Sequence, residues 1–261
     1  EDNTKPTKLV RIRHKLWSGR YSAPNAERPD TVGSVLMEQQ EKRRAGRPRT
    51  PLLSRTLIIE TALRLLDERG EDGAAMREVA RELGVRPSAL YNHVAGRDDL
   101  IGGIRELISD RIDVACFDVH PWDDALIRWA DSYRAAFAAH PPTIALLATT
   151  PLTPDSRTSL MYDRVVQALV LAGWPEDRAL TVIVAIESFL LGAALDAAAD
   201  PDMLDPGNRD DVRSFTSAFA SRRGTLAASG STPADAAYRL GIDAMVVGLR
   251  AEFAAGAFSG R

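Results

Sequence analysis

Beyond Pro51, apolar residues recur at three- and four-residue spacing, and this period constrains the fold more than any other feature. The first stripe comprises the pairs Ile58/Ile59, Ala62/Leu63 and Leu65/Leu66, which is the pattern of an amphipathic helix. Ser54 is a suitable N-cap for this helix, and Gly70 is suited to end it. Strand-like alternation is not found beyond Pro51. We therefore predict an all-α protein.

Prolines set most of the other predicted helix boundaries, because proline is tolerated in the first turn of a helix but breaks its interior. The predicted helices span residues 55–69, 75–83, 87–94, 98–115, 122–139, a short segment ending near 149, 155–171, 176–199, 210–222 and 234–254.

Residues 76–94 form the sharpest motif in the sequence. It reads as a helix, a tight turn at Gly84 and a second helix with Pro87 at its first position. Ala80 is small where two crossing helices must approach each other closely. This pattern predicts a helix-turn-helix, whose second helix enters the major groove of DNA. An ordinary helical hairpin with a polar outer face is the alternative.

The second helix of this motif carries polar and amphipathic side chains near its N-terminal end, where base edges are contacted. The predicted DNA contacts on it are Arg86, Ser88, Tyr91, Asn92 and His93.

Residues 54–116 resemble the DNA-binding domain of the tetracycline repressor (TetR) family over some 60 residues without a gap. The similarity is carried by Ile58–Leu66, Glu68-Arg69-Gly70, Arg77 with Ala80, Leu83-Gly84-Val85, Leu90-Tyr91, His93-Val94 and Arg97–Leu100. A weaker resemblance to the ligand-binding domain of one branch of the family covers residues 122–199. The resemblance implies a DNA-binding domain (51–116) and an antiparallel helical domain for ligand binding and dimerisation (117–261). The first 50 residues do not resemble the family, and their composition predicts a basic extension (1–50).

The family resemblance also assigns roles to single positions. Arg77 falls where the family uses an arginine to reach a guanine edge, and Tyr91, His93 and Arg97 fall on phosphate-contacting positions. The residues at the start of the recognition helix differ from the family pattern. The operator sequence therefore cannot be transferred.

Basic charge is concentrated at the N-terminal end. Residues 1–50 carry 12 Lys and Arg against 6 Asp and Glu, whereas residues 51–115 carry 9 against 12. Residues 42–49 hold five cations, and we predict that Arg47 and Arg49 reach the minor groove and supply phosphate affinity that the acidic domain lacks. A solubilising tail is the alternative.

Two apolar helices indicate a homodimer. Residues 176–199 are apolar almost all round, and the last helix has Gly241 and Gly248 seven residues apart. The family resemblance implies that these helices form a four-helix dimer interface, which would present two recognition helices to a palindromic operator. Core helices of a larger monomer are the alternative.

The C-terminal part also predicts a site for a small hydrophobic effector of unknown identity. The candidate lining residues are Trp129, Tyr133, Phe137, Leu146, Met161, Tyr162, Glu187 and Phe189. Glu187 could anchor a polar ligand group, pair with an arginine or face solvent. The resemblance places Leu146 on the family's magnesium-binding histidine, so we expect neither tetracycline as inducer nor a metal or other cofactor. Helix 98–115 is the predicted transmitter between the two domains.

Other classes of protein fit the sequence less well. Cys116 is the only cysteine, the four histidines are scattered, and no nucleophile elbow occurs, so a helical enzyme is a remote alternative. No apolar stretch approaches the roughly 18 residues of a membrane span, and we expect a cytoplasmic protein without a membrane partner. We predict a ligand-responsive repressor that binds double-stranded DNA. An activator, an effector-independent regulator or an interaction adaptor remain open.

Overall fold

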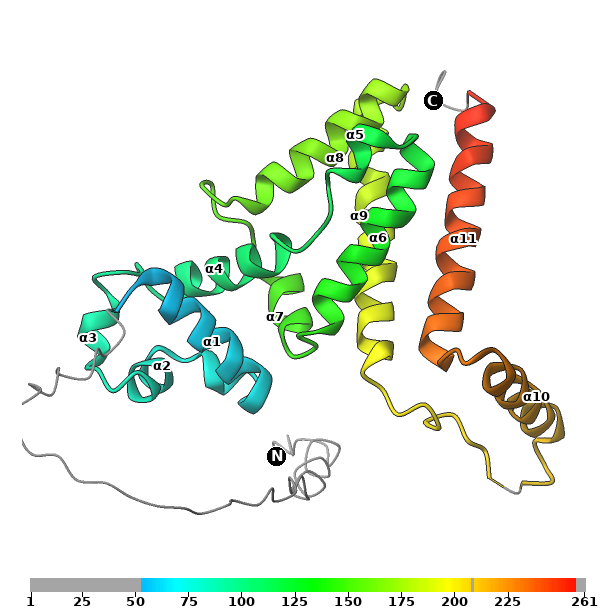
Figure 1. Cartoon of the computed structure of the whole chain (residues 1–261), viewed down its shortest axis with the longest axis horizontal. Helices are drawn as coiled ribbons and strands as arrows, with labels where there is room; N and C mark the ends of the chain where they lie inside the picture. The colour runs from blue at the N-terminus through cyan, green and yellow to red at the C-terminus, as the bar shows by residue number, and fades with distance from the viewer. Residues whose placement is uncertain (1–52, 208, 257–261) are drawn as a thin grey trace, which may run out of the picture. The chain divides into compact units, whose positions relative to one another are not determined.

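The computed structural model describes residues 53–207 and 209–256, and these residues form helices joined by turns and loops (Figure 1). The elements are α1 (Arg55–Arg69), the 3-10 helix η2 (Glu71–Ala74), α2 (Met76–Glu82), α3 (Pro87–Leu90), α4 (Arg97–Ser109), α5 (Cys116–Val119), α6 (Trp122–Ala138), α7 (Thr143–Thr149), α8 (Thr158–Ala172), α9 (Glu176–Ala197), α10 (Arg213–Ser229) and α11 (Pro233–Ala254). No strand occurs within these ranges, which confirms the predicted all-α class.

Helix α1 has the predicted boundaries. The Ser54 hydroxyl accepts a hydrogen bond from the Leu57 N–H at 3.2 Å, and Gly70 ends the helix with φ at +71°. The sequence analysis missed η2, which follows at once. Gly73 in η2 is buried so close to α1 that a Cβ atom would lie 2.1 Å from the Leu65 carbonyl oxygen. A side chain at this position would push η2 away from α1.

The predicted ends of two helices in this region were wrong. Helix α3 stops at Leu90, and the chain continues in tightened turns in which the His93 N–H bonds to the Leu90 carbonyl at 2.9 Å. Helix α4 stops at Ser109 rather than at residue 115. Asp113 explains this end, because its N–H donates to the Ser132 hydroxyl of α6 at 2.9 Å and its carboxylate accepts from the Cys116 N–H. These bonds begin α5, which the sequence analysis also missed.

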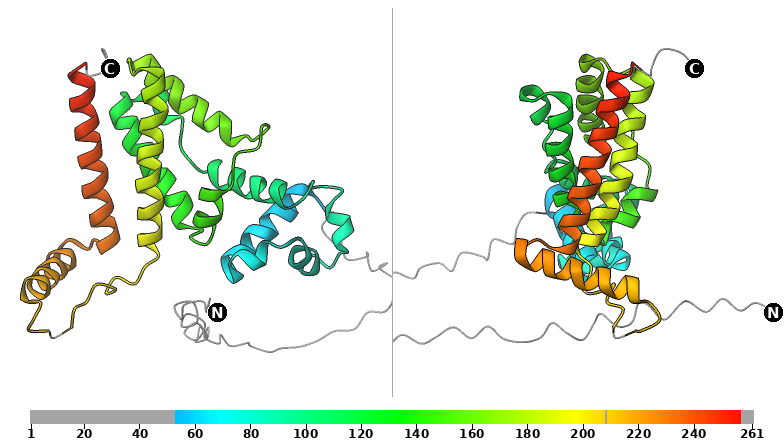
Figure 2. Two further views of the ribbon diagram at one scale, coloured as in Figure 1. Left: turned by 180° about the vertical axis from the view of Figure 1, so that it is seen from behind. Right: turned by 90° about the vertical axis from the view of Figure 1, so that its right-hand side faces the viewer.

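Helices α6, α8, α9 and α11 form the core of the C-terminal part. In both views, α9 and α11 run side by side (Figure 2), and α6 packs against both of them. The side chains that fill this region are apolar and fully buried, among them Leu126, Trp129, Leu169, Ile183 and Ile242.

Helix α9 was predicted to be covered on several sides, and the structure leaves one side open. Ile183 and Leu190 are buried, whereas Leu180 and Val184 are each 51% exposed. The sequence analysis found no apolar stretch of membrane-spanning length, but among the described residues α9 is the one helix that meets this test by length and composition. Because α9 packs against α6, α8 and α11, its apolar composition is that of a core helix.

Helix α10 differs from its prediction and from its neighbours. It begins three residues later and ends seven residues later than expected, because Gly230, with φ at +66°, is what terminates it. None of its residues is buried. It lies beyond the N-terminal end of α11, on the side away from α9 (Figure 1). The start of α8 was also predicted three residues too early, because the N–H of Arg157 is held by the Glu106 carboxylate of α4 before the helix begins.

Candidate DNA-binding surface and ligand cavity

The α2–turn–α3 segment has the geometry of a helix-turn-helix. Gly84 occupies the turn with φ at +67°, and the Val85 N–H bonds to the Ala80 carbonyl at 2.9 Å. Ala80 and Leu90 are buried between the helices. The glycine is required because side chains disfavour positive φ.

The predicted DNA contacts of this segment are all solvent-exposed. Tyr91 is 56% exposed although it is a large aromatic residue, and the Arg77 side chain is 83% exposed. Also exposed are Arg86, Ser88, Asn92, His93 and Arg97. An exposed tyrosine beside polar groups at the end of a recognition helix suits contact with a polar surface such as a nucleic acid.

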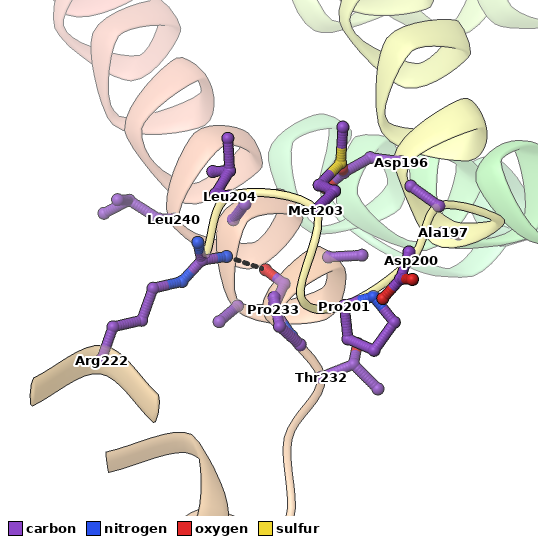
Figure 3. Close-up of a pocket in the computed structure, with 14 residues that line it drawn as sticks. Asp196, Ala197, Asp200, Pro201, Met203, Leu204, Arg222, Thr232, Pro233 and Leu240 are labelled. Carbon is purple, nitrogen blue, oxygen red and sulfur yellow. Dashed lines mark hydrogen bonds between the residues drawn. The ribbon is translucent and has the colours of Figure 1, made fainter. Parts of the chain in front are cut away.

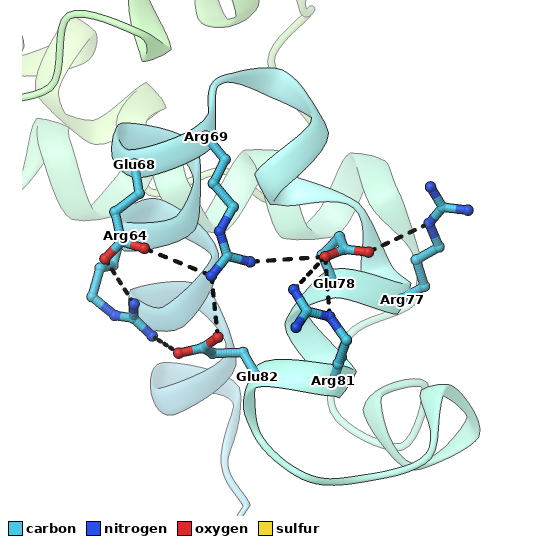
Figure 4. A network of polar contacts seen from close by, with 7 residues as sticks. All are labelled: Arg64, Glu68, Arg69, Arg77, Glu78, Arg81 and Glu82. Atoms are coloured by element: carbon cyan, nitrogen blue, oxygen red, sulfur yellow. Dashed lines mark hydrogen bonds and ion pairs between the residues drawn. The ribbon is translucent and has the colours of Figure 1, made fainter. Parts of the chain in front are cut away.

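A network of ion pairs joins side chains of α1 to those of α2 (Figure 4). Arg64 bonds to Glu68 at 2.9 Å and to Glu82 at 2.7 Å, and Arg81 bonds to Glu78 at 2.7 Å. Hydrogen bonds from Arg81 and Arg64 hold the pKa values of Glu78 and Glu82, respectively, below their usual range. Ion pairs with arginines of the same domain therefore neutralise part of its negative charge.

Arg97, a predicted phosphate contact, is paired with Glu71 in this structure. Both side chains are exposed, and exposed ion pairs contribute little stability. Arg97 can therefore exchange Glu71 for another anion at low cost. Arg47 and Arg49, the remaining predicted DNA contacts, lie outside the described residues.

A cavity of about 320 Å³ lies among α4, α6, α7, α8 and α9, and we call it the Glu187 cavity. It contains five of the predicted ligand residues: Tyr133, Phe137, Met161, Tyr162 and Glu187. Its other lining residues are Arg105, Ser109, Leu147, Ala148, Thr150, Leu152, Thr158, Val184, Ser188 and Leu191.

Three predicted ligand residues do not line this cavity. Trp129 is completely buried in the core. Leu146 is half-buried and packs against the core from α7. Phe189 faces α11, where its ring stacks on that of Tyr238 with centroids 6.0 Å apart. Periodicity alone could not separate the two apolar sides of α9.

Glu187 brings a buried carboxyl group to the cavity. It is only 9% exposed, and burial raises its pKa to about 7, although the nearby hydroxyl groups of Tyr162 and Tyr133 oppose this shift. The Tyr162 hydroxyl donates to Oε2 at 3.1 Å, while Oε1 is buried without a hydrogen-bond partner. The carboxyl group therefore retains unused capacity to accept a hydrogen bond.

Arg105 was missed by the sequence analysis. It lies on α4 and is 8% exposed, and its guanidinium donates to the carbonyls of Leu147 at 2.7 Å and Pro151 at 3.0 Å, and also to that of Thr150. Burial lowers its pKa. The sequence did contain a signal for Arg105, because a charged residue stands there at a position of the helix that the apolar pattern predicts to face the core. The contacts connect the end of α7, at the cavity wall, to α4. Helix α4 starts at Arg97, four residues after the turn that follows α3 (residues 91–93), which we call the recognition turn.

A second cavity of about 530 Å³ lies between the C-terminal end of α9, the loop that follows it and the start of α11, with Arg222 of α10 at its edge (Figure 3). Asp196 lines this cavity rather than the Glu187 cavity. Arg222 spans part of it and donates to the Pro233 carbonyl at 3.1 Å. Within the described ranges, no group of three or more His, Cys, Asp or Glu residues could hold a metal ion.

The exposed helix-turn-helix followed by a helical domain with an internal cavity defines the class of helix-turn-helix transcriptional regulators. Comparison with protein families specifies the class further. Residues 58–104 match bacterial regulatory proteins of the tetR family, and residues 119–253 match the tetracyclin repressor-like C-terminal domain. The chain belongs to the TetR family of DNA-binding transcriptional regulators.

Individual relatives agree with this assignment. The tetracycline repressor protein class A from transposon 1721 of Escherichia coli is 29% identical over 195 residues, which cover 74% of this chain and 88% of the relative. The HTH-type transcriptional repressor DrrR1 of Streptomyces coeruleorubidus is 27% identical over 157 residues, or 58% of this chain and 56% of the relative. A possible TetR family transcriptional regulator from Streptomyces coelicolor A3(2) superposes with a TM-score of 0.57 at 29% identity, covering 76% of this chain and 99% of that chain.

The matched segment spans 60% of the length of one further relative, an HTH-type transcriptional regulator of Saccharopolyspora erythraea. As with DrrR1, this is less than two thirds of the relative.

Proposed function

We propose that the protein is a homodimeric, ligand-responsive transcriptional repressor that binds a palindromic operator and is released when a small hydrophobic molecule occupies the Glu187 cavity. The observation that carries the proposal is the continuity of α4. This helix begins four residues after the exposed recognition turn, and its residue Arg105 lines the cavity. A ligand that favours one position of α4 would change the spacing of two recognition helices.

The exposed side of α9 and α11 supports the dimer. Leu180 and Val184 on α9 are half exposed, and Leu240 and Val247 on α11 are 75% and 61% exposed. Apolar residues at this spacing form stripes suited to helix–helix packing. Val184 also lines the Glu187 cavity, so a partner copy on this face would close the cavity mouth.

Arg77 provides the first test. Fragments of genomic DNA that bind the full chain are selected, and the affinity for an enriched inverted repeat is measured by fluorescence anisotropy at fixed salt. We expect Arg77→Ala to weaken binding about tenfold, because a bidentate arginine–guanine contact contributes roughly 1–3 kcal/mol.

Arg128→Ala is the matched control, because Arg128 is an exposed arginine on α6, away from the helix-turn-helix. It should leave the affinity unchanged. Failure to enrich any DNA fragment, or equal affinities of the two variants, would contradict the proposal.

A further inference from the structure

We infer that the Glu187 cavity takes a small aromatic molecule carrying a protonated amine, with the amine on the Glu187 carboxylate and the ring among Tyr133, Phe137 and Tyr162. This inference rests on the proposed function in one respect only, namely that the Glu187 cavity is the effector site.

The first argument is the state of the carboxyl group. Glu187 is nine-tenths buried, and no ion pair to it is found among the described residues. Only Oε2 receives a hydrogen bond, from Tyr162, whereas Oε1 has none. A buried acceptor without a partner is costly. Oε1 has almost no exposed surface in this structure, so an ammonium group in the cavity would supply the missing charge directly and the missing donor after a turn of the carboxyl group.

The second argument is the wall of the cavity. The rings of Tyr133 and Phe137 are stacked with centroids 4.8 Å apart, and Tyr162 lines the same space from α8. Aromatic faces attract cations and pack well against other rings. A volume of about 320 Å³ lies at the small end of ligand sites. It suits a molecule of one or two rings.

Arg105 is the one cation that lines the cavity, and it would oppose a second cation close to it. Its guanidinium already donates to three carbonyls at the end of α7. Glu187 Oε1, by contrast, has no donor. The unfilled interaction is therefore at the carboxylate, which is why we assign a cationic rather than an anionic ligand.

Proton release gives the inference a specific signature. Burial raises the pKa of Glu187 to about 7, so the free group is partly protonated at neutral pH. An ammonium ion beside it favours the ionised form. The groups that face it from the surrounding helices are Tyr133, Tyr162 and Arg105. The two tyrosines are neutral at this pH, because burial raises their pKa values well above the usual range.

The experiment is isothermal titration calorimetry on the full chain without DNA, with tryptamine, 3-ethylindole and indole-3-propionic acid as probes. These three share a ring system and differ in charge. At pH 7 we expect tryptamine to bind at least about tenfold more tightly than 3-ethylindole, as one charge-assisted hydrogen bond implies. Titrations in phosphate and in Tris should report release of roughly half a proton per tryptamine, as expected for a group titrating near that pH.

Glu187→Gln keeps the shape of the side chain and should abolish both the amine preference and the proton release. Asp163→Asn is the matched control, because Asp163 is an exposed acid beside Tyr162 on α8 that does not line the cavity. It should leave both properties unchanged. If the glutamine variant does not fold, the two-buffer comparison on the unmodified chain decides alone.

The inference is overturned if tryptamine and 3-ethylindole bind equally, if indole-3-propionic acid binds most tightly, or if tryptamine shows no binding. Release of operator DNA is measured separately. Amine-selective binding without DNA release contradicts the proposed function and supports this inference. DNA binding and release by other compounds, without amine selectivity, contradict this inference alone.

Discussion

Glu187 shows how one residue can work against stability. Its neighbours on α9 are apolar, and a carboxyl group among them remains neutral more readily than in water. The carboxyl group accepts a single hydrogen bond, from Tyr162. A residue that weakens the fold in this way and lines a cavity is a candidate for a role in binding.

Because the pKa of Glu187 in the folded chain is raised to about 7, folding favours the protonated form. The stabilising contribution is fully present below the unfolded pKa and is lost as the pH rises to about 7. We therefore expect Glu187→Gln to be more stable than the unmodified protein above pH 7, by roughly 3 kcal/mol. The advantage should shrink towards pH 5. Urea denaturation at both pH values measures this difference, and a pH-independent difference would contradict it.

At the scale of elements, α4 and α7 are connected chiefly by one side chain. Helix α7 is short, and the carbonyls at its C-terminal end need donors. Arg105 of α4 provides donors for Leu147, Thr150 and Pro151 together. The wall of the Glu187 cavity and the helix that follows the recognition turn are thus held by the same guanidinium group.

Replacing Arg105 with Met keeps the length and apolar stem of the side chain but removes these donors. Hydrogen bonds to charged groups contribute about 1.5–3 kcal/mol each, net of compensation by water. Methionine also removes the cost of burying the guanidinium charge, so we expect a loss of only about 2–3 kcal/mol in the free energy of unfolding. The amides of α7 should also exchange faster with deuterium. Arg128→Met, at the exposed site on α6, is the control and should change stability by less than about 0.5 kcal/mol. Equal effects of the two changes would refute this role for Arg105.

At the scale of the whole molecule, the exposed side of α9 and α11 is the surface on which we predict that two copies of the chain form a dimer. The exposed apolar residues Leu180, Leu240 and Val247 have no covering element in the part of the chain that the structure describes. The proposed repressor needs two recognition helices, because a single one contacts too few base pairs.

Val247→Asp places a charge in the centre of this face. We expect the molar mass measured by light scattering to fall to that of one chain, and operator affinity to fall at least about tenfold, because burying an unpaired charge costs several kcal/mol. Val119→Asp is the control, since Val119 is 74% exposed on α5, outside this face. A Val247→Asp variant that stays dimeric would place the interface elsewhere.

The helix-turn-helix was predictable in detail because its constraints are local. A glycine in the turn, a proline at the first position of α3 and a small residue at the helix crossing are all visible within 19 residues. The short elements η2 and α5 were not predictable in the same way. They depend on contacts with distant residues, such as that between Asp113 and Ser132.

The ligand site was predictable only in part. Aromatic residues and Glu187 stand out in the sequence, and five of the eight candidates line one cavity. Phe189 is two residues from Glu187, yet it faces α11 instead. Arg105 is more than 80 residues away in the sequence from Glu187 but lines the same space.

The sequence by itself determined the class of fold, most helix ends and the position of the helix-turn-helix, because helix periodicity, capping and turn formation act over a few residues. Tertiary structure decided which apolar side of α9 faces the cavity, which side stays open, and which charged residues are enclosed together. Burial depends on how separate helices pack, and packing joins side chains that no short window of sequence brings together.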